Sequence, residues 1–193
     1  MNAHALLDFA ALAIGSVYAT IPLFWLTVHP LIKRWRTAGR RAYVALVPLW
    51  FVYALAAFAT SWRFRHVHLY ISWMSWVPAI LFLFMGAALY QAGRQGFARA
   101  KLIGLAEIEP SNHRQELVTG GIRARVRHPF YLGHFCELFG WMLGTGSLAL
   151  AGLLVFSLIT GAIMMNREDA ELEQRFGDAF RQYRSRVPAF LPR

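Results

Sequence analysis

Residues 9–28 read FAALAIGSVYATIPLFWLTV. This stretch has no Lys, Arg, Asp or Glu, and an α-helix of that length covers about 30 Å, the thickness of the hydrocarbon core of a bilayer. The stretch therefore predicts a transmembrane helix. Residues 1–8 contain no Lys or Arg and end in Asp8, unlike the charged start of a signal peptide, so we expect the segment to remain as a span.

Further apolar runs follow, and together they predict an all-α, polytopic integral membrane protein with five transmembrane helices. Pro48 is a predicted kink in the second run, and Gly144-Thr145-Gly146 alone separates the last two runs, which predicts a helical hairpin. The composition agrees, since 57% of the residues are hydrophobic and the mean hydropathy is +0.39, above the values of ordinary soluble domains. The runs cover residues 9–28, 42–60, 70–90, 129–145 and 147–165.

Basic residues gather on one side of the predicted bundle. The first connection holds five Lys and Arg, residues 91–127 hold seven and the tail holds six, whereas the opposite side holds only Arg63 and Arg65. The positive-inside rule then puts the N-terminus outside and the long loop and C-terminus in the cytoplasm. The formal net charge of +10 suits an anionic membrane surface, and we expect no nucleic-acid partner.

The chain divides into two regions at the end of the third run. Residues 1–91 form an N-terminal three-span membrane region, and residues 92–193 hold the cytoplasmic loop, the hairpin and the tail. The tail is predicted to form an amphipathic cytoplasmic helix, interrupted near Gly177, because apolar side chains recur at helical spacing: Leu172, Phe176, Phe180 and Tyr183. The hairpin returns the chain to the loop's side, so loop and tail can build one site.

The turn before the fourth run reads Arg-His-Pro-Phe-Tyr-Leu-Gly, from Arg127 to Gly133. Pro129 fits the first turn of a helix, where its missing N–H is not needed, so the fourth helix is predicted to begin there. The free backbone donors of a helix start beside Arg127 suit a carboxylate or a phosphate. The alternative is that Arg127 extends to lipid headgroups at the membrane surface.

Acids follow the fifth run directly. Glu168 and Asp169 come just after Arg167, and Glu171 shares a helix face with Glu168. Carboxylates beside a membrane are suitable partners for an ammonium or sulfonium group. The alternative is a charged face that only meets solvent.

Span four also carries ionisable residues inside its apolar sequence. His134 and Glu137 are three residues apart and share a face with Tyr131. An acid within a membrane helix is either functional or paired with another group. We expect no metal, because the apolar runs hold no second His-x-x-Glu pair and the single cysteine, Cys136, cannot build a zinc site. His29 is expected at the membrane interface.

The motifs in the second half resemble those of one enzyme superfamily. They comprise Leu117-Val118-Thr119-Gly120-Gly121-Ile122, then Val126 to Gly133, and after the hairpin Glu168-Asp169-x-x-Leu172-x-x-x-Phe176-Gly177 with Tyr183. This order resembles the isoprenylcysteine carboxyl methyltransferase and phospholipid methyltransferase superfamily, over residues 117–192. The family pattern usually differs at a few positions, with a second glutamate at Asp169, an aromatic at Arg123, a tyrosine at Phe180 and often an arginine at Ala189.

The resemblance implies a methyltransferase that uses S-adenosylmethionine, with residues 92–193 as its core. It implies that the cofactor lies between the Arg-His-Pro helix start and the acidic pair, contacted by His128, Pro129, Tyr131, Gly133, Glu168 and Asp169. Arg127 would pair with the methionyl carboxylate or with the substrate, and Glu168 would accept hydrogen bonds from the ribose or amino group. The lipophilic substrate, a lipid or a prenylated molecule, would enter from the bilayer.

The acceptor stays open between two chemistries. A carboxylate nucleophile needs no base, and Arg127 or Arg186 would orient it, whereas an ammonium must lose a proton first, to Glu137 or His134. We favour an isoprenylcysteine-like carboxylate over a phospholipid amine. From a different functional class, the chain would be a non-catalytic lipid-binding module.

Overall fold

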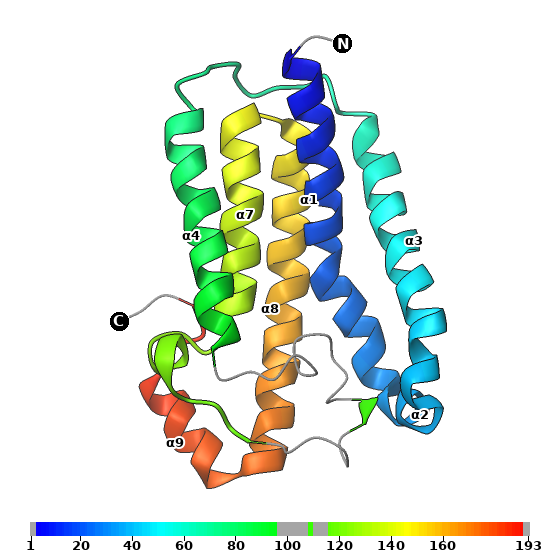
Figure 1. The fold of residues 1–193 in the computed structure, drawn as a ribbon, viewed down its shortest axis with the longest axis vertical. Coiled ribbons are helices and arrows are strands. Elements are labelled where there is room, and N and C mark those ends of the chain that lie inside the picture. Colours follow the sequence, from blue (N-terminus) through cyan, green and yellow to red (C-terminus); the bar gives the residue numbers. More distant parts are fainter. Residues whose placement is uncertain (1–2, 96–107, 110–115, 191–193) are drawn as a thin grey trace.

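The computed structural model describes residues 3–95, 108–109 and 116–190. Most of these residues are helical, and the one extended pairing among them is the isolated bridge between His68 and Ser147. Long helices lie side by side along one axis (Figure 1), and they are α1 (Ala3–Val28), α3 (Tyr43–Trp62), α4 (Trp76–Arg94), α7 (Pro129–Thr145) and α8 (Leu148–Phe176). Short ones complete the fold: η1 (His29–Leu31), α2 (Ile32–Ala38), η2 (Gly39–Ala42), η4 (Gly121–Ala124) and α9 (Asp178–Arg186).

The all-helical class that the sequence predicts is confirmed, and the chain is an integral membrane protein. Within the described residues, three helical stretches are long and apolar enough to cross a membrane: His4–Trp62, Trp76–Arg94 and Leu148–Phe176. The first stretch contains α1 and α3, which run in opposite directions (Figure 1). Large apolar side chains on the outer faces of α3 and α4 are exposed, as lipid-facing residues are, among them Val44, Phe51, Leu55, Val77, Leu81 and Phe84.

The predicted start of the third run at Tyr70 is wrong, because α4 begins at Trp76. The residues before it pair with the hairpin between α7 and α8. The Leu69 amide donates to Gly146 O at 2.8 Å, and the Tyr70 hydroxyl donates to Leu143 O at 2.7 Å. These long-range bonds hold the backbone extended, so a local apolar pattern does not become helix there.

The helical hairpin forms where the sequence predicts it. Gly146 ends α7 with a φ of +66°, and Ser147 begins α8 by accepting a hydrogen bond from the Leu150 amide. A Cβ at Gly146 would lie 2.2 Å from Tyr70 O, so both the conformation and the space require glycine. Beyond the predicted end at residue 165, α8 continues unbroken to Phe176 and carries the acidic residues on the same rigid helix.

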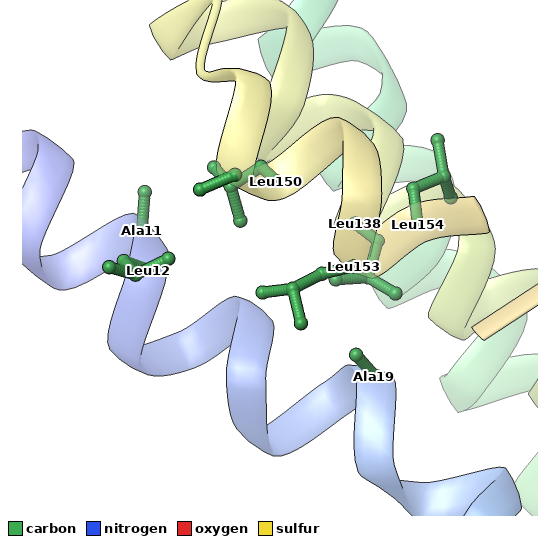
Figure 2. Close-up of a cluster of buried hydrophobic side chains, with 8 residues drawn as sticks. Ala11, Leu12, Ala19, Leu138, Leu150, Leu153 and Leu154 are labelled. Carbon is green, nitrogen blue, oxygen red and sulfur yellow. The ribbon is translucent and has the colours of Figure 1, made fainter. Parts of the chain in front are cut away.

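The core of the bundle lies between α1, α7 and α8. Figure 2 shows side chains from these three helices turned toward one another, and all of them are buried: Ala11, Leu12, Ala19, Leu138, Leu150, Leu153 and Leu154. On the other side, α4 packs closely on α7. A Cβ at Gly140 would lie 3.0 Å from Ala79 O, so small residues let these two helices approach as membrane helices commonly do.

The chain turns back on itself after α8. Gly177 has a φ of +55° and separates α8 from α9, as the sequence predicts. Phe180, Tyr183 and Val187 of the tail are buried together and pack on Leu117, Leu172 and Phe176. The start of α7, the end of α8, α9 and the basic α2 therefore gather at one end of the bundle, opposite the first turn of α1 (Figure 1).

Candidate functional site

The start of α7 is held by the tail of the chain. The amides of Arg127 and His128 donate to Pro188 O at 2.9 Å and to Ala189 O at 3.2 Å. As predicted, Pro129 occupies the first turn of α7. It is also buried. Two donors at this helix start are thus taken by backbone carbonyls, and they are not free for an anion.

Asp169 joins the two motifs that the sequence singles out. Its Oδ2 accepts from Arg127 Nη2 at 2.7 Å, and its Oδ1 is 3.0 Å from His128 Nε2. The Asp169 side chain is only 6% exposed. A buried carboxylate between two cationic groups is a strong, charge-assisted link, so Asp169 fixes α8 against the start of α7.

His128 lies between both acids of α8. Its Nδ1 is 3.6 Å from Glu168 Oε2, opposite the Nε2 contact with Asp169. Burial lowers the pKa of His128, but hydrogen bonds and charges from Asp169 and Glu168 outweigh it and raise the pKa from 6.5 to about 9. Below that pH both ring nitrogens carry protons and donate. Glu168 is 39% exposed, so its carboxylate can accept hydrogen bonds from a ligand as well.

Arg127 is engaged almost completely by the protein itself. Its Nη1 donates to Arg184 O at 3.3 Å and to Val187 O, while Nη2 holds Asp169. Its Nε is buried and has no hydrogen-bond partner among the described residues. The guanidinium therefore ties the tail to α8, and only Nε is left for a ligand.

The structure brings Arg184, and not Arg186, to the acidic residues. Arg184 Nε is 4.0 Å from Asp169 Oδ2, and Nη1 is 3.4 Å from Glu173 Oε2. Arg186 is exposed and its Nε donates to Gln182 O at 3.1 Å, within its own helix. Helical spacing is the signal for this difference, because Arg184 lies four residues after the buried Phe180.

Tyr131 and His134 continue the site into the bundle. The Tyr131 ring lies 6.0 Å from the His128 ring and 6.3 Å from the His134 ring. His134 is buried, its Nδ1 is 2.6 Å from Phe130 O, and the rings of Tyr18 and Tyr90 surround it. A row of aromatic and imidazole rings thus leads from the acids of α8 toward the membrane interior.

Gly133 and Glu137 face α4 rather than the acids. A Cβ at Gly133 would lie 3.3 Å from Gly86 O of α4, and a Cβ at Gly86 would lie 2.8 Å from the Glu137 side chain. The close approach that Gly133 permits is therefore between two helices.

No group of three metal-binding side chains occurs within the residues that the structure describes.

Two further residues tie the site together, and the sequence pattern does not single them out for this role. Arg123 of η4 is buried, donates from Nη1 to Gly93 O at 2.7 Å and lies 5.3 Å from the Phe130 ring. The Tyr183 hydroxyl donates to Arg123 O at 2.7 Å. They join the end of α4, the start of α7 and α9.

A separate apolar cavity of about 630 Å³ lies between α1, α3 and α8. Hydroxyl groups on its wall, such as those of Thr20 and Thr60, donate to carbonyls of their own helices. None of the predicted site residues lines it. The cavity and the acidic site are therefore different places in the molecule.

Comparison with known proteins connects this arrangement to methyltransferases. The sequence model of the phospholipid methyltransferase family matches residues 108–179, a range that contains the start of α7, the hairpin and the acids of α8. Over 81 residues the chain is 43% identical to the protein-S-isoprenylcysteine O-methyltransferase of Schizosaccharomyces pombe. This match covers 39% of the chain and 33% of that protein.

Two further relatives match at lower identity. An uncharacterized protein of Haemophilus influenzae is 37% identical over 62 residues, which are 32% of this chain and 98% of that protein. The nickel-cobalt-cadmium resistance protein NccN of Alcaligenes xylosoxydans xylosoxydans is 39% identical over 80 residues, 40% of this chain and 37% of that protein. The chain thus spans about a third of the S. pombe protein and of NccN. No solved structure matches significantly.

Proposed function

The chain belongs to the superfamily of isoprenylcysteine carboxyl methyltransferases and phospholipid methyltransferases, and we propose that it transfers a methyl group from S-adenosylmethionine to a lipophilic acceptor. The observation that carries this proposal is the link between the start of α7 and the acids of α8, in which His128 lies between Asp169 and Glu168. Both halves of this link fall within the matched residues.

The side chains present fit such a cofactor. Its methionyl ammonium and ribose hydroxyls are hydrogen-bond donors, and the partly exposed carboxylate of Glu168 is an acceptor for them. The Tyr131 ring lies 6.0 Å from the ring of His128, the histidine that faces Glu168. It supplies an aromatic surface beside the site. When bound, S-adenosylmethionine supplies a methyl group on a positively charged sulfur.

The residues of the chain then have distinct tasks in the proposed reaction. Glu168 holds the cofactor's donor groups, and His128 orients Glu168. Asp169 and Arg127 act behind them, because their charges neutralise each other and lock the tail over the site. Positioning of the two reactants and exclusion of water supply most of the rate for a direct methyl transfer.

For the acceptor we favour an isoprenylcysteine-like carboxylate. The S. pombe relative bears that activity in its name, and a carboxylate can attack without losing a proton first. Arg184, whose guanidinium reaches Glu173 and approaches Asp169, is better placed than Arg186 to orient a carboxylate at this site.

A phospholipid amine is the second candidate, because the matched family takes its description from phospholipid methylation. An ammonium group must give up a proton before it attacks. His134 and Glu137 on α7 are the candidate bases, and the row of rings through Tyr131 connects His134 with the site.

For the membrane arrangement we infer five spans, formed by α1, α3, α4, α7 and α8. The end that carries the site faces the cytoplasm, since the basic α2 and the basic tail lie at the same end (Figure 1). The lipophilic acceptor then reaches the site from the cytoplasmic half of the bilayer.

Calorimetry with S-adenosylhomocysteine on the detergent-purified protein tests the cofactor. We expect binding that His128→Ala and Glu168→Ala each weaken at least about tenfold, since each removes a charged hydrogen-bond partner. His66→Ala, an exposed histidine at the other end of the bundle, serves as the control and keeps wild-type affinity. Undiminished binding by both site variants would contradict the assignment, and a wild type that binds nothing would favour the non-catalytic lipid-binding module.

Transfer of radiolabel from S-adenosylmethionine then separates the acceptors. The two substrates to compare are a small prenylated thiol acid and total phospholipid. A base-labile labelled product indicates an ester and supports the carboxylate, whereas a base-stable product in the lipid fraction supports the amine.

A further inference from the structure

A second histidine meets the acids of α8, and it comes from the N-terminal region. His29 lies in η1, directly after α1, and its Nδ1 is 2.9 Å and 3.0 Å from the two carboxylate oxygens of Glu171. The His29 side chain is 12% exposed and that of Glu171 is 38% exposed. The imidazole therefore reaches the helix as a largely buried group and not as a mobile surface side chain.

The contact lies on the same helix face as the proposed cofactor site. Glu171 follows Glu168 by three residues, so the two carboxylates are neighbours on α8. Glu168 faces His128 at 3.6 Å, and Glu171 faces His29. Two glutamates on one turn of α8, Glu168 and Glu171, thus each face an imidazole, one from each region of the chain.

The position of His29 is set by packing around it. Val28, the preceding residue, is 1% exposed and packs in a cluster with Ala42, Leu46 and Ile108. The Trp25 ring lies 5.9 Å from the imidazole in an edge-on arrangement. Earlier in the chain, α1 packs on α8 through the core shown in Figure 2. The end of α1 is therefore rigid, and His29 can fix Glu171.

We propose that His29 is a positioning residue of the methyltransferase site, which fixes Glu171 and with it the turn of α8 that presents Glu168 to the cofactor. This inference rests on the function proposed above. Residue 29 lies well before the part of the chain that the family model matches, residues 108–179. The N-terminal region therefore contributes to the site as well as to the membrane anchor.

The test compares His29→Ala, His29→Asn and Glu171→Gln in the full-length protein. Asparagine can place an N–H where the imidazole has Nδ1, so it should restore most of what alanine loses. We expect His29→Ala to raise both the Kd for S-adenosylhomocysteine and the KM for S-adenosylmethionine about three- to tenfold, with kcat within about twofold of wild type. The double variant should be no worse than either single variant, because both changes break one contact.

Amide hydrogen exchange without cofactor adds a readout that does not depend on activity. Exchange in residues 166–172 should be faster in His29→Ala than in His66→Ala, which changes an exposed histidine at the opposite end of the bundle. If His29→Ala does not fold, Glu171→Gln, which keeps the size of the side chain and removes its charge, replaces it in the comparison.

The outcomes separate the inference from the function on which it rests. Unchanged affinity in His29→Ala and Glu171→Gln, additive effects in the double variant, or a loss of kcat alone would each overturn the role of His29. A wild type that neither binds S-adenosylhomocysteine nor transfers methyl overturns the proposed function, whatever the exchange data show. If the wild type binds S-adenosylhomocysteine but His29→Ala shows the same affinity and the same exchange as the wild type, the role of His29 is overturned and the proposed function stands.

Discussion

His128 gives the site a pH dependence with a defined sign. Its pKa is raised from 6.5 to about 9 by Asp169 and Glu168, against the effect of burial. The charged imidazole therefore stabilises the fold fully below pH 6.5, and this contribution is lost as the pH rises through 9. The contribution is at most about 3 kcal/mol.

We expect His128→Gln to remove this pH dependence. Thermal unfolding of the detergent-solubilised protein, followed by circular dichroism, should show that the wild type loses more stability between about pH 6 and about pH 10 than the variant does. Glutamine keeps a polar side chain of similar size, so packing changes little. His66→Gln, at an exposed position, controls for other groups that titrate. Equal pH slopes in wild type and His128→Gln would contradict the raised pKa.

The charge of Asp169 balances two cationic groups of the site, Arg127 and His128. Asp169 holds Arg127 at 2.7 Å and His128 at 3.0 Å and is buried. Asp169→Asn leaves two cations without their counter-charge, and we expect it to lower the free energy of unfolding by about 3–5 kcal/mol. The matched control is Asp178→Asn, since Asp178 is 84% exposed in its ion pair with Arg181, where a loss below about 1 kcal/mol is usual. Denaturant titration measures both, and equal losses would contradict the role of Asp169.

The sequence predicts which motifs meet, but not which atoms meet. The Arg127-His128 turn and the Glu168-Asp169 pair are expected on one side because a hairpin separates them, and the contacts of Asp169 show that they touch. The use of Arg127 by the tail could not be predicted, because it depends on carbonyls near Val187 that α9 brings back to α7. A pattern of side chains carries no information about such backbone partners.

At the scale of helices, the contact between α4 and α7 depends on missing side chains. A Cβ at Gly140 would lie 2.9 Å from the Leu83 side chain and 3.0 Å from the backbone oxygen of Ala79. Gly140→Ala must push α4 away, and we expect it to cost about 1–3 kcal/mol. Gly152 on α8 has nothing within 4 Å of such an atom, so Gly152→Ala should instead stabilise by up to about 1 kcal/mol through helix propensity.

Unfolding midpoints of these two variants, measured in the same detergent, test whether α4 and α7 pack as closely as the structure has them. Opposite signs for Gly140→Ala and Gly152→Ala support close backbone packing of α4 on α7. A stabilising Gly140→Ala would mean that the helices are farther apart than the structure has them.

Apolar runs predict helices well where the local pattern is the only influence. The fourth run is found as α7 with both ends as predicted, because Pro129 starts it and Gly146 stops it. The third run begins late, at Trp76, because the chain before it pairs with the hairpin. The fifth extends into charged residues up to Phe176. A polar sequence can continue a helix when its apolar side chains are buried, and here Leu172 and Phe176 pack against the tail. Errors thus occur where distant contacts decide.

For the whole molecule, the candidate site and most of the basic residues lie at the same end of the bundle. Basic α2, the start of α7, the acids of α8 and α9 all lie there, and the connection between α3 and α4 with Arg63 and Arg65 lies at the other end (Figure 1). The sequence predicts this division by counting Lys and Arg. It does not predict that the end of α1 would touch the acids, because the pairing of His29 with Glu171 joins residues 142 positions apart.

The orientation in the membrane can be tested with the chain's single cysteine removed. In a Cys136→Ser background, Thr37→Cys places a thiol on exposed α2 and Ser72→Cys places one in the exposed connection before α4. Because the basic end should face the cytoplasm, we expect a membrane-impermeant maleimide to label Thr37→Cys only in inside-out vesicles and Ser72→Cys only in right-side-out vesicles. Labelling of both after detergent lysis confirms that the thiols are reactive. The reverse pattern would put the site outside the cell, and it would contradict both the orientation and a cytoplasmic methyl transfer.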